Sequence, residues 1–438
     1  MSEHHIDFKQ DSPLLEPLTT QSFRNEALKR KKIRQRKKIA LGLLSLILIG
    51  LASFGFLYPS VREYLDRFFH KKSSEVEWDG PSLFKTKAQH FNLDVSGDGL
   101  SGIIEVRQGP VDQVELTIDG TIFYGDNSKV PFHQNSLVKD EDTLHRGLHI
   151  KIKETDDDFI ADIILQEEGD DGTGTQKPVS ALLKFTIVFP ESYKTYQSLS
   201  ISARTSKEED RFIDILIAED LVVEFKTLGI QADTGSILAR NTLVTETLVS
   251  FSYHGSTFSG IKAAPGKSLE IHSKTDSLAL EMTVLTTPLN DAEADPHSVY
   301  VSSKSGNVIL LAYPDLSSIT ELGASPAKVN IEATSKTGFV DVTVDFEDDS
   351  QHLSLYAKSY AGNVFATISD KLAGSLELKS EKKSVNVLPK KGSESEIVYE
   401  EKTSTKIFAH KTLPSGSRVQ NSDVFLTSKD GHAELAFV

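Results

Sequence analysis

Apolar and polar residues alternate with a period of two along much of the chain after residue 78. The clearest runs are residues 91–95, 111–118, 148–152 and 183–189. Side chains of a β-strand point alternately to its two faces, so this alternation predicts strands that are buried on one face. Clusters of Gly, Asn and Asp separate the runs, as expected for tight turns between strands. We expect no long amphipathic helix after residue 80, and the pattern predicts a mainly β fold.

From about residue 198 the alternating runs recur as a repeat, in which one run leads into a small or polar turn and a second run follows. Copies occupy residues 230–238, 269–280, 299–310, 329–344, 353–366 and 424–437. Most intervals are 20–32 residues, a period typical of solenoids. Because one unit is too small to bury its own apolar face, neighbouring units are expected to stack and share one core. The longer intervals are expected to hold loop insertions, at residues 288–296 and 390–405.

The turn of each repeat carries a small residue. We expect a positive φ angle there, which glycine and, less readily, aspartate adopt at low steric cost. These turn positions are Gly235, Gly255, Asp276, Gly306, Gly338, Gly362 and Gly431.

A stretch without any charged residue, residues 39–57, precedes the alternating region. In a helix these residues would span about 28 Å, close to the thickness of the hydrocarbon core of a bilayer. Tyr58 follows, as is typical of the membrane interface. A buried core helix rarely runs this long without a charge, so we predict a transmembrane helix. A cleaved signal peptide with a soluble secreted product is the other alternative, but its basic and apolar regions are shorter. An uncleaved signal anchor is therefore favoured over cleavage near Ser53.

Basic residues flank the predicted span unequally and predict its orientation. Four follow the span within about 15 residues, whereas eight precede it. Cytosolic flanks of membrane spans are the richer in Lys and Arg, so the N-terminus is expected in the cytosol and the rest of the chain outside the cell or in a lumen. The eight preceding residues are Lys29, Arg30, Lys31, Lys32, Arg34, Arg36, Lys37 and Lys38.

The predicted cytosolic tail contains a short motif, Asp11-Ser-Pro-Leu14-Leu15. It resembles the acidic-dileucine sorting signals of proteins sent to endosomes, lysosomes or vacuoles. The commoner form has its acid one residue further upstream, where this chain has Gln10. The expected location is accordingly the plasma membrane or a vacuolar or endosomal membrane.

Residues 58–77 are predicted to form an amphipathic stalk next to the membrane. Pro59 suits the first turn of a helix, and an apolar stripe with helical spacing runs from Val61 to Phe69. The stripe is consistent with a helix that lies on the membrane or extends the span, or with a seam for self-association. Trp78, the single tryptophan, is assigned to the same stalk.

Composition narrows the chemistry. The 438 residues include no cysteine, which excludes a disulfide scaffold, a thiolate metal site and a cysteine nucleophile. The net charge is −15, but residues 1–38 alone carry +5, so the remainder carries −20. We expect no nucleic-acid partner, because nucleic-acid binding relies on Lys and Arg that displace counterions.

No known catalytic or metal-binding spacing is present. There is no Gly-x-Ser-x-Gly or His-Glu-x-x-His motif, and His254 and His272 are expected to be surface residues of strands. Acidic clusters at residues 156–158, 167–171 and 347–349 suit Ca²⁺ chemically, but their spacing does not require them to converge. We therefore assign no catalytic, cofactor-binding or metal residues and expect no cofactor. No ladder of aromatic residues for sugar rings stands out in the linear sequence.

The repeated units with the pattern Ser-Lys-Thr/Ser-Gly followed by alternating apolar residues resemble the putative-adhesin domain family of unknown function. The family comprises β-solenoid domains found in bacterial surface proteins and in fungal-type single-pass membrane proteins. The likeness covers residues 198–438 and extends in divergent form to residues 80–197. It implies a β-solenoid and no catalytic residues.

Five segments result: a basic cytosolic tail (residues 1–38), a transmembrane signal anchor (39–57), a stalk (58–77), an N-terminal β region (78–197) and a repeated β-solenoid (198–438). The expected function is non-catalytic: a β-helix-like stack of short strands presents a surface to a protein or polysaccharide partner, or to another copy. A membrane-tethered carbohydrate-active enzyme is the alternative, since paired carboxylates cleave glycosidic bonds. The sequence leaves the ligand and oligomeric state open.

Overall fold

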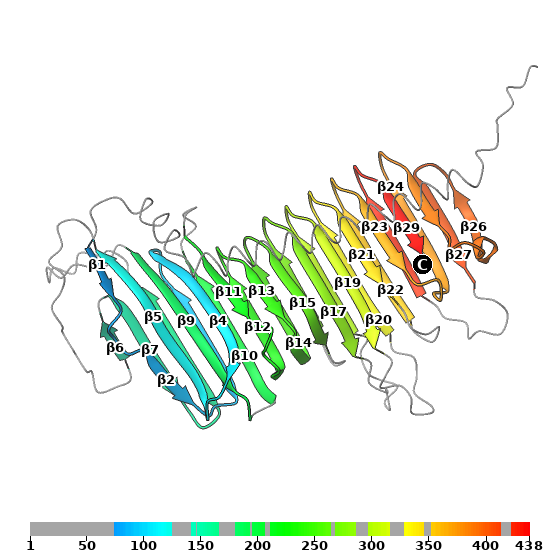
Figure 1. Cartoon of the computed structure of the whole chain (residues 1–438). Coiled ribbons are helices and arrows are strands. Elements are labelled where there is room, and N and C mark those ends of the chain that lie inside the picture. Colours follow the sequence, from blue (N-terminus) through cyan, green and yellow to red (C-terminus); the bar gives the residue numbers. More distant parts are fainter. Residues whose placement is uncertain are drawn as a thin grey trace, which may run out of the picture. The chain divides into compact units, whose positions relative to one another are not determined.

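The computed structural model describes residues 74–124, 142–145, 147–165, 180–192, 195–205, 211–263, 268–285, 297–315, 328–345, 352–412 and 422–438, which belong to one compact unit, Ser73–Val438. Strands and turns dominate this unit, which confirms the mainly β prediction (Figure 1). The tail, the predicted membrane span and the predicted stalk helix lie outside the described residues. Among the residues described, no helix is long and apolar enough to cross a membrane.

Most strands belong to two ladders of parallel strands, which we call ladder A and ladder B. In both ladders each strand pairs with strands of the neighbouring repeats, in register except for shifts between Phe225 and Thr227 and between Phe258 and Ile261. In spatial order, ladder A contains β8 (Asp158–Leu165), β3 (His90–Ser96), β10 (Thr195–Arg204), β12 (Glu224–Ala232), β14 (Leu243–Ser252), β16 (Ser268–Ser273), β18 (His297–Ser303), β20 (Lys328–Ser335), β22 (His352–Ser359), β28 (Ser422–Ser428) and β24 (Gly374–Ser380).

Ladder B follows the same order. It contains β9 (Ser180–Pro190), β4 (Leu100–Gly109), β11 (Ile213–Ile217), β13 (Ile237–Arg240), β15 (Ser256–Ala263), β17 (Leu278–Leu285), β19 (Val308–Asp315), β21 (Val340–Val344), β23 (Val364–Ile368), β29 (Ala433–Phe437) and β25 (Val385–Leu388). One strand of ladder A, its turn and one strand of ladder B make a rung.

The inward side chains of both ladders form one continuous apolar core. On β22, for example, Leu353, Leu355 and Ala357 are buried and alternate with more exposed residues. Parallel register places each inward residue beside the equivalent residue of the next rung, as Leu355 beside Val424. Each rung thereby covers the apolar face of its neighbour, which is the stacking that the repeat predicts.

The rungs do not stack strictly in sequence order. The first rung of the chain, β3–β4, lies between β8–β9 and β10–β11. The last rung, β28–β29, lies between β22–β23 and β24–β25. The first and the last rung of the chain therefore insert into the stack instead of finishing it, which the linear order of the repeats does not predict.

Antiparallel strands flank the stack at both ends. At one end β7 (Leu148–Glu154) pairs with β8 and with β6 (Asp142–His145), while β5 (Val114–Tyr124) pairs with β9, β1 (Ser74–Glu77) and β2 (Leu83–Thr86). At the other end β27 (Lys406–Lys411) pairs with β24 and with β26 (Ile397–Lys402). These antiparallel strands cover the backbone of β8, β9 and β24, which would otherwise offer an open edge for further parallel pairing.

Three details differ from the sequence analysis. Residues 390–405 are not one loop, because they include a short 3-10 helix, η1 (Glu394–Glu396), and β26. The rung β24–β25 was not recognised, since its turn Glu381-Lys-Lys383 has no glycine. The first strand begins at Ser74, and Trp78 is not part of an exposed stalk: it is 8% exposed in the core, and its indole N–H donates to the Pro81 carbonyl at 3.3 Å.

The turn glycines are required for a different reason from the one expected. Among the predicted turn positions, only Gly255 has a left-handed φ, of 115°. At Gly338 and Gly362 an added Cβ would lie 2.2 and 2.3 Å from the carbonyl oxygen of the turn glycine in the adjacent rung. Glycine is needed there because the backbones of neighbouring turns approach each other closely, and the φ angle is not the constraint.

Candidate interaction surface

A straight row of outward side chains crosses ladder A at one register position. On each rung the residue lies three positions before the serine that ends the strand, and parallel pairing aligns these residues. Tyr300 thus pairs with Glu332, and Glu332 with Tyr356. We call this set the aromatic–acidic row; in spatial order it contains Val249, Glu270, Tyr300, Glu332, Tyr356, Phe425, Glu377 and Phe408.

The row faces solvent, but its members differ in exposure. Tyr356 and Phe425 are each 37% exposed and Val249 at one end is 42% exposed, whereas Tyr300 is half-buried, with its ring centre 5.1 Å from that of His272. Adjacent strands of a sheet lie about 4.8 Å apart, so successive residues of the row are spaced by that distance. The straightness of the row comes from in-register stacking, which leaves no offset between rungs.

Short polar side chains lie on both sides of the row. Serine, asparagine and aspartate occupy the register position two residues earlier, and hydroxyl or basic residues occupy the position two residues later. The first set is Ser298, Asn330, Ser354, Asp423 and Ser375; the second is His272, Ser302, Thr334, Lys358, Thr427 and Lys379.

Carboxylates outnumber amines on this surface: Glu270, Glu332, Glu377 and Asp423 lie beside Lys358 and Lys379. The Glu377 carboxylate pairs with the Lys379 ammonium on the same strand. The His272 ring is 4.0 Å from the Glu270 carboxylate and hydrogen bonds the Ser302 hydroxyl at 2.8 Å. Within the described part of the chain, Glu332 forms no ion pair, so its carboxylate at the centre of the row is available to a ligand.

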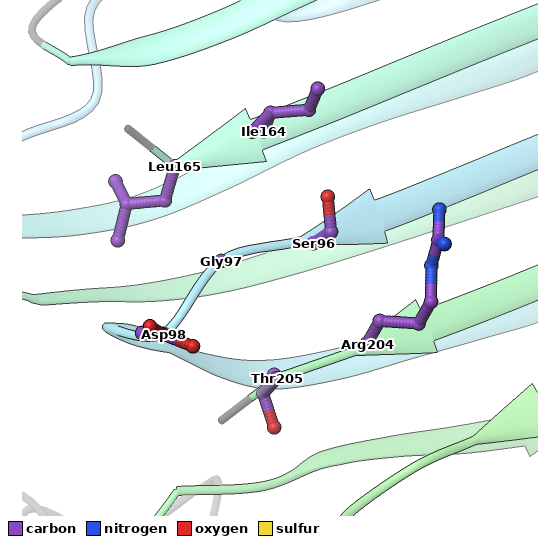
Figure 2. Close-up of a pocket in the computed structure, with 7 residues that line it drawn as sticks. All are labelled: Ser96, Gly97, Asp98, Ile164, Leu165, Arg204 and Thr205. Atoms are coloured by element: carbon purple, nitrogen blue, oxygen red, sulfur yellow. The ribbon is translucent and has the colours of Figure 1, made fainter. Parts of the chain in front are cut away.

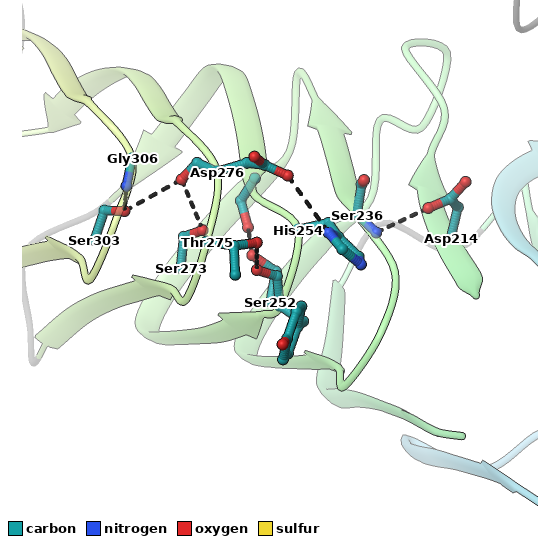
Figure 3. Close-up of polar contacts among 11 residues, drawn as sticks. Asp214, Ser236, Ser252, His254, Ser273, Thr275, Asp276, Ser303 and Gly306 are labelled. Carbon is teal, nitrogen blue, oxygen red and sulfur yellow. Dashed lines mark hydrogen bonds and ion pairs between the residues drawn. The ribbon is translucent and has the colours of Figure 1, made fainter. Parts of the chain in front are cut away.

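A second ordered feature is the turn edge, where serines connect successive rungs. In the turn after β18 the Gly306 N–H donates to the Ser303 hydroxyl oxygen at 2.9 Å, and that hydroxyl donates to the Asp276 carbonyl at 3.2 Å (Figure 3). Ser335 and Ser359 repeat the arrangement on the next two rungs. We call it the serine–glycine relay; Ser428 and Ser380 extend it, the latter with Lys383 in place of glycine. The relay satisfies buried backbone groups and is structural.

Polar groups also gather beside this relay, around His254 (Figure 3). The His254 ring nitrogen Nδ1 is 3.5 Å from the Asp276 carboxylate. The Asp214 carboxylate accepts a hydrogen bond from the Ser236 backbone N–H at 2.8 Å. Burial raises the pKa of Asp214 above its ordinary value, and the Ser236 hydrogen bonds and His254 oppose that rise. Among the described contacts no hydrogen bond joins Ser236 to His254, so the group does not form a nucleophile–base pair.

An open depression lies where β3, β8 and β10 end (Figure 2). Its lining combines the apolar Ile164 and Leu165 with Asp98 and Arg204. The Arg204 guanidinium forms an ion pair with the Asp94 carboxylate, so its charge is already compensated. This depression offers no set of convergent polar groups comparable to the aromatic–acidic row.

The residues singled out from the sequence are distributed as follows. The sorting motif with Asp11, Leu14 and Leu15, the basic cluster 29–38 and the acidic clusters 167–171 and 347–349 lie outside the described residues. Acidic residues 156–158 lie at the β7–β8 turn, where the Asp158 carboxylate accepts a hydrogen bond from the Thr155 hydroxyl at 3.3 Å. His254 and His272 have side chains that are 46% and 33% exposed. In the part of the chain that the structure describes, no group of three or more His, Asp or Glu is arranged to hold a metal.

The aromatic–acidic row was missed by the sequence analysis, which found no aromatic ladder. The signal was present but required alignment of the repeats on Ser-x-x-Gly, because the aromatic residues are far apart in the sequence. Tyr356 and Phe425, which lie in adjacent strands, are an example. Because the order of the last rungs is exchanged, Phe425 lies beside Tyr356, and Glu377 lies one rung further along the stack.

Comparisons with known proteins add little to this geometry. No protein-family model and no curated protein matches the sequence. Among solved structures, a putative cell adhesion protein from Clostridium sporogenes covers 84% of this chain and 100% of its own length at 11% identity and a TM-score of 0.16. A putative adhesin from Bacteroides fragilis covers 84% and 99% at 11% identity with a TM-score of 0.26, and one from Parabacteroides distasonis covers 84% and 98% at 7% identity with a TM-score of 0.23. TM-scores this low define neither the family nor the function of the chain.

Proposed function

We propose that the chain is a membrane-anchored, non-catalytic β-solenoid protein whose ladder A presents a binding surface outside the cell or in an organelle lumen. The observation that carries the proposal is the continuous row of outward-facing, half-buried to exposed aromatic and acidic side chains across consecutive in-register rungs. A rigid sheet holds such a row without ordering loops on binding, so little conformational entropy is lost when a partner docks.

The surface suits binding of an extended partner. A glycosidase of the usual kind needs two carboxylates that flank one bond, commonly with the pKa of one of them raised. The carboxylate with a raised pKa, Asp214, belongs to the turn edge around His254 and not to the aromatic–acidic row. The single charged side chain that is buried among the described residues is an amine, Lys411.

The membrane part of the proposal rests on residues 39–57 and the basic residues before them. An apolar stretch of that length needs lipid or a large core to cover it. The strand unit follows the stretch in the sequence, so a cytosolic N-terminus places the unit on the opposite side of the membrane.

The experiment uses cells that produce the full chain with one epitope tag before Met1 and another after Val438. We expect the protein to stay in the membrane pellet after an alkaline wash, with the two tags differing in their accessibility to protease added to intact cells and to sealed vesicles. The variant with Leu44→Arg and Leu48→Arg is the control and should be released from the pellet. Equal accessibility of both tags, or release of the unaltered chain, would contradict the proposal.

The choice of membrane is tested separately by imaging a fluorescently tagged full chain with Leu14→Ala and Leu15→Ala. If the dileucine pair is read as a sorting signal, the variant moves from internal membranes to the cell surface. An unchanged distribution would show that this motif does not sort the protein, and it would leave the proposed anchoring unaffected.

A further inference from the structure

We propose that the aromatic–acidic row binds a neutral, extended polysaccharide whose chain runs across the strands of ladder A. The core of this site is Tyr300, Glu332, Tyr356 and Phe425 on four consecutive rungs. The inference rests on the proposed function, because it assigns a partner to the surface that the proposed function leaves without one.

The spacing of the row fits an extended polysaccharide. Consecutive rungs are about 4.8 Å apart, close to the length of one ring in an extended β-linked hexose polymer. Tyr300 and Tyr356 are two rungs apart, about 9.6 Å, which matches two such rings. Each tyrosine therefore meets the same face of the polymer, and Glu332 lies between them.

The side chains of the row also suit the two kinds of surface on a sugar ring. The apolar C–H face of a sugar ring packs on an aromatic ring, whereas its equatorial hydroxyls need hydrogen-bond partners. The Glu332 carboxylate accepts hydroxyl protons, and charge-assisted hydrogen bonds of this kind are stronger than neutral ones. Ser298, Asn330 and Ser354 on one side of the row add short donors and acceptors at the same spacing.

Charge excludes a polyanion from the row. Carboxylates outnumber amines in the row and its borders, because Lys406, which pairs in register with Lys379, is already engaged in an ion pair with Glu401. A polyanion would therefore be repelled. A neutral polymer gains the ring packing and the hydroxyl hydrogen bonds of the row without that repulsion.

Other extended partners fit the row less well. Side chains on one face of an extended peptide recur about every 6.6 Å, so they fall out of register with rungs spaced by about 4.8 Å. A second copy of ladder A has the matching spacing. However, face-to-face packing would bury the Glu332 carboxylate, which forms no ion pair within the described residues, and burial of an unpaired charge is costly.

The test measures retention of the purified full chain, in detergent, on insoluble cellulose and chitin, which are extended β-linked polymers. A β-1,3-glucan and starch serve as neutral helical polymers, and heparin beads serve as a polyanion. We expect retention on cellulose, chitin or both and none on heparin; equal retention on the helical polymers would overturn the match of spacing. The variant with Tyr300→Ala and Tyr356→Ala is expected to weaken binding at least tenfold for each tyrosine removed. Glu332→Gln is expected to weaken it about tenfold, with the fold unchanged by circular dichroism.

The matched control is Tyr313→Ala, because Tyr313 is also 37% exposed but belongs to β19 of ladder B. This variant should bind as tightly as the unaltered chain. An equal loss in Tyr313→Ala and in the row variant would overturn the assignment of the site. So would a concentration-dependent dimer in sedimentation that disappears in the row variant.

Failure of this inference is distinguishable from failure of the proposed function. If the tags show an anchored chain with its strand unit across the membrane, yet none of the neutral polymers retains it, then the polysaccharide inference is wrong and the anchoring is unaffected. If the tags contradict the anchored topology while Tyr300 and Tyr356 still govern retention on a polymer, then the inference about the row holds and the membrane placement fails.

Discussion

The middle of the stack and its two ends are built by different rules. From β16 to β23 every rung pairs in parallel with the next, and Ser303, Ser335 and Ser359 repeat the same hydrogen bonds at the turn. At the ends the chain reverses into antiparallel strands such as β5 and β27, and at the C-terminal end a buried ammonium adds an ionic contact. Repetition supplies a straight surface in the middle, whereas the ends must prevent further strands from adding.

The C-terminal end shows how a non-repetitive element is held. Lys411 at the end of β27 is fully buried, and its ammonium pairs with the Glu396 carboxylate at 3.1 Å and donates to the Asp370 carbonyl. The same ammonium lies 5.3 Å from the centre of the Phe437 ring. One ionic contact thus connects η1, β27 and the last strand, β29. In the middle of the stack, neighbouring rungs are held instead by repeated neutral hydrogen bonds of the serine–glycine relay.

The largest effect is expected in the middle of the stack, for Gly362→Ala. The new Cβ would lie 2.3 Å from the Gly338 carbonyl oxygen, so the two turns must separate. We expect a loss of about 3 kcal/mol in the free energy of unfolding, at the upper end of overpacking costs. The control Gly229→Ala has only Ser200 Oγ nearby, at 3.7 Å, and should change stability by less than about 0.5 kcal/mol. Urea unfolding of both variants measures the difference, and equal midpoints would contradict the close turn stacking.

The next effect is expected at the C-terminal end, for Glu396→Gln. It leaves the buried Lys411 ammonium without its counter-charge. We expect a loss of about 2 kcal/mol, less than the full cost of breaking a buried pair because the Glu396 side chain is 22% exposed. Adding Lys411→Met should recover part of the loss, since no unpaired charge then remains. Unfolding midpoints of the single and double variants test this, and a double variant that is less stable than Glu396→Gln would contradict it.

A smaller effect is expected for Ser359→Ala, which removes one step of the relay. The Gly362 N–H and the Gly338 carbonyl each lose a hydrogen bond at a site where Ser359 is fully buried. About 1–2 kcal/mol should be lost. Ser354→Ala, on the outer face of the same strand, serves as control and should stay within about 0.5 kcal/mol of the unaltered chain. Amide hydrogen exchange at Gly362 should accelerate only in Ser359→Ala; the same acceleration in the control would refute the relay.

The smallest effect is expected at the turn edge, for Asp214→Asn. Because burial raises the pKa of Asp214 in the folded state, the ionised carboxylate destabilises the fold above that pKa. This destabilisation is relieved as the pH falls through the raised pKa toward 3.8, the ordinary value. The variant should therefore be slightly more stable at neutral pH, with a difference that fades toward pH 3.8. A variant that is less stable at neutral pH would show that the Ser236 hydrogen bonds outweigh burial.

Much of the fold can be predicted from the sequence, because the spacing of the repeats gives the size of one rung. The runs 299–310, 329–344 and 353–366 all form rungs with the expected turns. The order of the final rungs was not readable. Both β24 and β28 present two inward apolar residues at the same positions, so either strand fits beside β22. Which one pairs depends on the connection through β26 and β27, and local pattern carries no information about that.

The candidate surface was readable in part. Aligning the strands on their terminal serine reveals a column with Tyr300, Glu332 and Tyr356, but its meaning depends on parallel register. A shift of one residue would turn the column to the core face. The residues of the turn edge are harder to predict from the sequence, because Asp214 and His254 lie in different rungs and neither forms a motif with its sequence neighbours.

The account depends most on the exchanged order of rungs, which places Phe425 beside Tyr356. Because the chain has no cysteine, paired cysteine substitutions test this order without competing native thiols. Neighbouring strands bring paired Cα atoms to about 5 Å, within reach of a disulfide. We predict rapid oxidation of the full chain with Tyr356→Cys and Phe425→Cys, detected by a mobility shift without reductant, and none for Tyr356→Cys with Glu377→Cys. Cross-linking of the second pair and not the first would contradict the stack and the row built on it.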